Sequence, residues 1–303
     1  MAAPHLAPLV FLPTVKIKNI LFATDFSPCS ESAQRVATAV ARTHGSNLLV
    51  THVIPPEPLL PTPMEPPTWE YENLTEQAES QLAQIAISLV DIPHRTQLKI
   101  GNLWPELASL ITKYDIDLIV VGTHGRSGFS KLFLGSNAEE IYRQAPCPVM
   151  TVGPDLNSEL LDRGRFTSVL FAGDFAGGSD HAFPLALSLA EENQALLTLL
   201  HTVEEGTMAA LYLHQRLVRE SRGRLEKLIP PDHKLLHPPE IVIRVGYPAE
   251  EIINVARNRE CDLIVMGVHQ AGHFGAKASA HLPWTIANTV IRNGHCPVIT
   301  VKG

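Results

Sequence analysis

One short segment of the chain combines residue types that suit the binding of an anion. It reads GTHGRSGFSKLFLGSN over residues 122–137 and follows the apolar run DLIVV. Its glycines, Gly122, Gly125 and Gly135, let backbone N–H groups approach an anion closely. Ser136 comes directly before a helical pattern, and the amino terminus of a helix attracts negative charge. The segment therefore predicts a loop that binds phosphate groups.

Charged and hydroxyl side chains extend this chemistry. Arg126 and Lys131 could add positive charge from the loop, and Ser136 could donate its hydroxyl to a phosphate oxygen or cap the helix. Asp25 follows the apolar run ILFAT and could hold a metal ion near the phosphates. It could equally cap a helix that starts near Ser27, and the two roles are compatible.

Motifs of established catalytic sites are missing from the sequence. There is no GxxxxGK[ST] phosphate loop, no GxSxG elbow and no kinase motif set. His269, His273 and His281 have no carboxylate or cysteine at a zinc-ligand spacing, so we interpret them as surface or lightly packed histidines. No nucleophile–base pair can be named, and the sequence predicts no catalytic residue.

Strands and helices that would position these residues alternate along the chain. Runs such as LIVV and LIVM are apolar throughout, which favours strands buried on both faces of a parallel sheet. In the first half the pattern predicts strands near 18–24, 47–54, 96–101, 117–122 and 148–152. It predicts helices near 28–44, 74–91, 104–114 and 136–144, with the proline-rich stretch 55–73 as a surface loop. This alternation is typical of a doubly wound α/β fold.

The second half of the chain repeats the first. KNILFATDFSPCSESA (18–33) matches TSVLFAGDFAGGSDHA (167–182), and DLIVVG matches DLIVMG. Three pairs of residues lie 149 positions apart: Asp25 and Asp174, His52 and His201, and Cys147 and Cys296. Matched landmarks in one order indicate a tandem duplication.

We therefore predict two tandem α/β domains, each with a five-stranded parallel sheet flanked by helices. The predicted divisions are a flexible arm over 1–16, a first domain over 17–153, a linker over 154–165 and a second domain over 166–303. In such sheets ligands bind beyond the carboxyl ends of the strands. The ends of three strands, at Asp25, Val53 and Gly122, would then border one crevice.

The spacing Gly122-x2-Gly125-x9-Gly135-Ser136, with the following NAEEIYRQAPCPVMTV, resembles the signature of the universal stress protein (UspA-like) family. The resemblance implies a Rossmann-like, adenine nucleotide alpha hydrolase-like fold that binds ATP, with Mg²⁺ near Asp25. It implies that the nucleotide-binding residues are Ala23, Thr24, Asp25, Val53, Gly122, Thr123, His124, Gly125, Arg126, Gly135, Ser136 and Asn137.

The same resemblance implies how the domains associate. Family domains pair through their last strands, so the strand at 149–152 is expected to pair with the one at 298–301 as an internal pseudo-dimer. A further homo-oligomer is possible on this basis. The function it implies is that of an ATP-binding sensor or adaptor in a stress response. The alternatives are a slow ATPase or nucleotide-dependent enzyme, and an interaction scaffold without nucleotide.

The second copy departs from the signature. In GVHQAGHFGAKASAHLPWTIAN, Gln270 stands in place of Gly125 and Trp284 in place of Gly135. A tryptophan side chain would fill space that a triphosphate needs and would hinder approach to the backbone. We predict that the second domain does not bind ATP in the family manner, although it keeps Asp174.

Composition narrows the class of protein further. The net charge of −7 and a pI of about 6.0 argue against binding to nucleic acid or to an anionic membrane. The chain has 303 residues and only four cysteines, none in a CxxC pair, which favours a reducing cytoplasmic setting. No apolar run is long enough to span a bilayer, so we expect a soluble protein.

Overall fold

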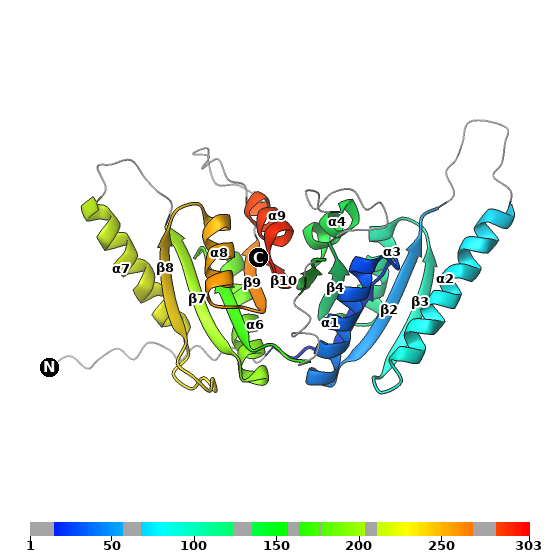
Figure 1. Cartoon of the computed structure of the whole chain (residues 1–303), viewed down its shortest axis with the longest axis horizontal. Helices are drawn as coiled ribbons and strands as arrows, with labels where there is room; N and C mark the ends of the chain where they lie inside the picture. The colour runs from blue at the N-terminus through cyan, green and yellow to red at the C-terminus, as the bar shows by residue number, and fades with distance from the viewer. Residues whose placement is uncertain are drawn as a thin grey trace, which may run out of the picture.

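The computed structural model describes residues 15–56, 68–123, 135–154, 156, 164–175, 177–203, 211–268 and 283–303. Within these residues, ten strands form one continuous sheet in the order β3-β2-β1-β4-β5-β10-β9-β6-β7-β8. The two halves of the chain lie side by side, each with its own helices packed on the sheet (Figure 1). The predicted doubly wound α/β fold, present twice, is confirmed.

The first half alternates strands and helices, and its neighbouring strands are parallel. Strand order reverses between β1 and β4, which lie next to each other although they are distant in sequence. The elements are β1 (Asn19–Ala23), α1 (Pro28–His44), β2 (Asn47–Ile54), α2 (Thr68–Ser88), β3 (His94–Ile100), α3 (Leu103–Lys113), β4 (Leu118–Gly122), α4 (Ser136–Gln144) and β5 (Val149–Val152).

The second half repeats this topology. Its elements are β6 (Ser168–Ala172), α6 (Gly177–Asn193), β7 (Leu196–Val203), α7 (Leu211–Leu228), β8 (Glu240–Val245), α8 (Pro248–Asn258), β9 (Leu263–Val268), α9 (Pro283–Asn293) and β10 (Val298–Lys302). The halves join where β5 and β10 run antiparallel, with Thr151 opposite Val298. The Thr151 hydroxyl donates to the Val298 carbonyl at 3.1 Å. The predicted internal pairing of the last strands is present.

Apolar side chains cover both faces of the sheet, which explains the uninterrupted apolar runs in the sequence. In β1, Ile20 and Phe22 pack with residues of α1, α2, α6 and α7 on one face. Leu21 packs with residues of α3, α4, α8 and α9 on the other face. Each hydrophobic cluster extends across both halves, so the two copies share their cores.

Helix α1 begins and ends where its sequence predicts. Ser27 is the N-cap, accepting a hydrogen bond from the Ser30 N–H, and Pro28 occupies the first turn, where its missing N–H costs nothing. Gly45 ends the helix in the left-handed conformation at φ 64°, which glycine adopts without steric cost. These local signals fix the bounds of the helix that carries Ser30.

Helix α2 corrects two predictions. It begins at Thr68, so the last six residues of the stretch predicted as a loop are helical, and it ends at Ser88 rather than near 91. Pro66 and Pro67 do not prevent a helix from starting directly after them, because proline disrupts a helix only beyond its first turn. The acidic TWEYEN sequence also suits the amino terminus of a helix.

Contacts outside the sheet also connect the halves. His44 at the end of α1 pairs with Glu192 of α6, and Tyr142 of α4 donates its hydroxyl to Asn288 of α9. Val15, which the sequence assigns to the flexible arm, accepts a hydrogen bond from Ser188 at 3.0 Å and packs against the core. Among the described residues, no helix has the length and hydropathy needed to cross a membrane.

Candidate functional site

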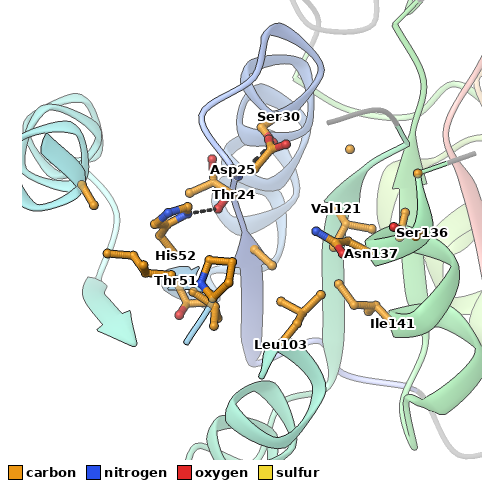
Figure 2. Close-up of a pocket in the computed structure, with 18 of the residues that line it drawn as sticks. Thr24, Asp25, Ser30, Thr51, His52, Leu103, Val121, Ser136, Asn137 and Ile141 are labelled. Carbon is orange, nitrogen blue, oxygen red and sulfur yellow. Dashed lines mark hydrogen bonds between the residues drawn. The ribbon is translucent and has the colours of Figure 1, made fainter. Parts of the chain in front are cut away.

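A cavity of about 450 Å³ lies beyond the carboxyl ends of β1, β2 and β4. Helices α2, α3 and α4 complete its walls. Figure 2 shows Ser136 and Asn137 of α4 across the cavity from Thr51 and His52 of β2. This is the point where strand order reverses, which is the usual ligand site of open α/β sheets.

The side chain of Asp25 is held by hydroxyl and backbone donors. Its Oδ1 accepts from the Ser30 hydroxyl at 2.5 Å (Figure 2). The same oxygen accepts from the Ser27 N–H at 3.1 Å, and the backbone nitrogen of Asp25 lies 3.3 Å from the Ser30 hydroxyl oxygen. Burial by itself would raise the pKa of Asp25, but the hydrogen bonds from Ser30 and Ser27 outweigh it and hold the pKa below its usual value. The cavity therefore presents a fixed, ionised carboxylate.

His52 and Phe26 brace the turn that carries Asp25. The Nδ1 of His52 is 2.7 Å from the Thr24 carbonyl, a distance that requires an N–H on this nitrogen. The centroids of the His52 and Phe26 rings are 4.5 Å apart. Phe26 has a positive φ of 59°, an unfavourable conformation for a bulky side chain that persists at functional sites only with support from neighbours. His52, a residue of β2, is thus held by a hydrogen bond to the backbone at the end of β1.

Gly122 allows β4 to approach α1 without a side chain between them. A Cβ at Gly122 would lie 3.0 Å from the carbonyl carbon of Cys29 and 3.1 Å from the backbone nitrogen of Ser30. This is closer than ordinary van der Waals contact. The glycine is thus required by packing against α1, and this packing brings the end of β4 next to the Asp25 turn.

The amino terminus of α4 opens into the cavity. The N–H of Gly135 donates to the Thr123 carbonyl at 2.8 Å, and Thr123 donates its own N–H to Val152 at 2.9 Å. Gly135 is the N-cap in an extended conformation, with Ser136 and Asn137 exposed in the first turn. The N–H groups at the start of a helix lack partners within the helix, so this end of the cavity favours an anion.

Neutral side chains from α2 and α3 form the opposite wall. It contains the side chains of Leu74, Gln77, Ala78, Gln81 and Leu103. Aliphatic side chains with a few amides suit a flat, uncharged ring system, whereas the α4 end suits phosphate groups. One end of the cavity therefore suits an anion, and the other suits an uncharged ring.

Most of the predicted site residues line this one cavity. They are Ala23, Thr24, Asp25, Val53, Gly122, Thr123, Gly135, Ser136 and Asn137. His124, Gly125, Arg126 and Lys131 lie outside the described residues. The prediction missed Ser30, Thr51, His52 and the α2 wall. Ser30 had a signal in the sequence, because Ser179 follows Asp174 at the same interval.

The second half keeps one part of this arrangement and changes another. Ser179 donates to Asp174 at 2.6 Å, as Ser30 does to Asp25. Helix α9, however, begins at Pro283, so Trp284 lies within the helix, whereas its counterpart Gly135 precedes α4. The backbone at this position therefore differs between the halves. Gln270 and the three histidines that we interpreted as surface or lightly packed residues lie outside the described part of the chain.

Sequence comparison assigns the family. The model of the Universal stress protein family matches residues 16–153 and again residues 165–302. The chain belongs to this family. Two matches in one chain agree with the internal repeat, so it is a tandem universal stress protein.

Relatives from several organisms support the assignment. A universal stress protein of Thermus aquaticus is 35% identical over 138 residues, covering 45% of this chain and 98% of the relative. Universal stress protein Rv1996 of Mycobacterium tuberculosis is 23% identical over 314 residues and covers 94% of this chain and 95% of its own length. The crystal structure of a universal stress protein from Archaeoglobus fulgidus covers 95% of this chain and 99% of its own, with a TM-score of 0.66 and 21% identity. The tandem fold is thus shared along nearly the whole length.

Proposed function

We propose that this universal stress protein binds ATP in the cavity of its first half and acts as a sensor or adaptor whose surface depends on nucleotide occupancy. The observation that carries the proposal is the pairing, in one cavity, of the α4 amino terminus with the ionised Asp25 and the neutral α2 wall. The α4 end suits phosphates, and the α2 wall suits an adenine ring.

Each part of the cavity has a role in this proposal. The backbone N–H groups of Ser136 and Asn137 would bind phosphate oxygens, and Thr123 would hold the loop end in place through its contact with Gly135. The backbone of Val53, at the end of β2, would meet the adenine edge. Asp25 would contact the sugar or a metal ion on the phosphates.

The residues present fit a magnesium ion that arrives with the nucleotide. Mg²⁺ prefers oxygen ligands and commonly takes one carboxylate together with phosphate oxygens and water. Asp25 supplies an ionised carboxylate, and no cluster of three or more metal-binding side chains occurs among the described residues. Such an ion would neutralise phosphate charge, with Asp25 as its protein ligand.

The same carboxylate disfavours efficient ATP hydrolysis. A general base works best when its pKa is close to the working pH, and the hydrogen bonds from Ser30 and Ser27 lower the pKa of Asp25 instead. Asp25 would therefore be a poor acceptor for a proton from an attacking water. Slow turnover is compatible with a sensor whose surface depends on nucleotide occupancy.

The test is mass spectrometry of the ligand released from the purified full-length protein. We expect an adenine nucleotide from the wild type and from Asp174→Ala, and little or none from Asp25→Ala. Asp174→Ala is a matched control, because Asp174 accepts a hydrogen bond from Ser179 just as Asp25 accepts one from Ser30. If the protein carries no nucleotide and binds none after incubation with ATP, the proposal is wrong and the alternative of an interaction scaffold without nucleotide is favoured.

A further inference from the structure

A second cavity, of about 470 Å³, lies at the opposite edge of the first half, where β1, β2 and β3 begin. It is separated from the first cavity by the length of these strands, roughly 15 Å or more at about 3.3 Å per residue. None of its lining residues lines the first cavity. A molecule bound in the second cavity would therefore not overlap with a nucleotide bound in the first.

Strand register places its side chains. Arg95 is opposite Leu49 and Asn47 is opposite Asn19, and residues two apart on a strand share a face. Leu49 packs with residues of α3 and α4, so this set faces the α3 side of the sheet. The other wall is Tyr114, the C-cap of α3.

The cavity combines an apolar floor with polar and positively charged groups. Leu49 is buried beneath it, and Tyr114 is half-buried at its side. The Asn47 amide donates to Asn19 at 2.9 Å, and Arg95 is exposed at the rim. The Lys113 ammonium lies 5.0 Å from the centre of the Tyr114 ring.

Two carboxylates, Asp115 and Asp117, flank the lining residue Ile116. Asp117 accepts hydrogen bonds from the backbone N–H groups of Lys18 and Asn19 at 2.8 and 2.9 Å, so it is directed at the backbone. Asp115 is exposed in the turn after Tyr114. Arg95 is thus the guanidinium that lines the cavity, beside the aromatic ring of Tyr114.

The duplicated half provides an internal comparison. There Glu240 is opposite Thr198, as Arg95 is opposite Leu49, and Arg259 is the C-cap of α8, as Tyr114 is of α3. Arg259 donates to Glu240 in two hydrogen bonds, of 2.8 and 2.6 Å. In the second half, the ion pair of Arg259 and Glu240 therefore occupies the position that corresponds to the cavity. In the first half, Tyr114 and Arg95 cannot form that pair.

We propose that this cavity binds a small aromatic carboxylate. The ring of the ligand would lie against Tyr114 and Leu49. Its carboxylate oxygens would accept two hydrogen bonds from the guanidinium of Arg95. The paired amides of Asn19 and Asn47 would border the ring edge. A volume of about 470 Å³ is within the range of small-molecule sites.

The test uses para-fluorobenzoate as probe, fluorine NMR as readout, and the full-length protein, first without ATP and then with ATP in excess. The neutral para-fluorobenzamide is the matched probe. Tyr114→Arg combined with Arg95→Glu installs the ion pair that the second half already has, and Arg95→Gln removes only the charge at an exposed position. Thermal unfolding and circular dichroism report that both variants fold.

We expect the benzoate to bind the wild type, and to bind both variants at least about tenfold more weakly, with the benzamide as weak as the variants. The proposal is overturned if the wild type does not broaden or shift the benzoate signal. It is equally overturned if the variants or the benzamide bind as the wild type does with benzoate, or if ATP displaces the probe. None of these outcomes depends on whether ATP is the nucleotide of the first cavity.

Discussion

Replacing Gly122 by alanine tests the contact between β4 and α1. The new Cβ would lie 3.0 Å from the carbonyl carbon of Cys29 and 3.1 Å from the Ser30 nitrogen. These are backbone atoms of the first helical turn, which cannot rotate away as a side chain can. Relief therefore requires β4 and α1 to separate by a few tenths of an ångström, which is the situation of an overpacked core.

Overpacking of this kind costs about 1–3 kcal/mol in the free energy of unfolding. With an m value of about 3 kcal/mol/M in urea, the denaturation midpoint should fall by about 0.3–1 M. Because Gly122 and the Asp25 turn both line the cavity, ATP binding should weaken as well.

Gly153→Ala is the matched control, because no atom lies within 4 Å of its added Cβ. Both substitutions reduce the conformational freedom of the unfolded chain by the same amount, so their difference isolates the steric term. Urea denaturation followed by circular dichroism measures both. A midpoint for Gly122→Ala equal to or above that of Gly153→Ala would refute the reasoning.

Two further predictions concern titration and the junction between halves. Because the folded pKa of Asp25 is lowered, its carboxylate stabilises the fold above pH of about 4 and loses this effect as pH falls through the folded pKa. The stability difference between wild type and Asp25→Asn should accordingly be larger at pH 7 than at pH 3, as urea midpoints at the two pH values would show; a difference that grows towards pH 3 would contradict it. Burial raises the pKa of Tyr142 to about 12, so the wild type should lose stability as pH rises from about 10 to about 12. Tyr142→Phe should lose less stability than the wild type over this interval, although the thiols of Cys147, Cys261 and Cys296, whose pKa values burial also raises, still titrate in it. Without the hydrogen bond to Asn288 it should be about 1 kcal/mol less stable at pH 7, and equal urea midpoints at pH 7 would argue against this contact.

Local sequence signals predicted the elements that begin and end with clear caps. Ser27, Pro28 and Gly45 define α1 almost without reference to the rest of the chain. Helix α2 lacks such a signal, because the prolines before it also suit a loop. The helix packs against β2 and β3, and such tertiary contacts are not contained in the sequence pattern.

The candidate site divides in the same way. Asp25 and Gly122 were predictable because each lies at the end of an apolar strand, and strand ends meet at one edge of a parallel sheet. The wall from α2 was not, since the face that α2 turns to the cavity is set by its tertiary packing. The contrast between Arg95 and Glu240 likewise became visible only from the register of β3 and β8.

The central claim is that the duplicated chain binds ATP once, in its first half. Titration calorimetry of the full-length protein with ATP and Mg²⁺ measures this directly through the binding stoichiometry. We predict one ATP per chain, unchanged by Asp174→Ala and abolished or greatly weakened by Asp25→Ala. Two equivalents per chain, or binding that survives Asp25→Ala and disappears in Asp174→Ala, would contradict the account.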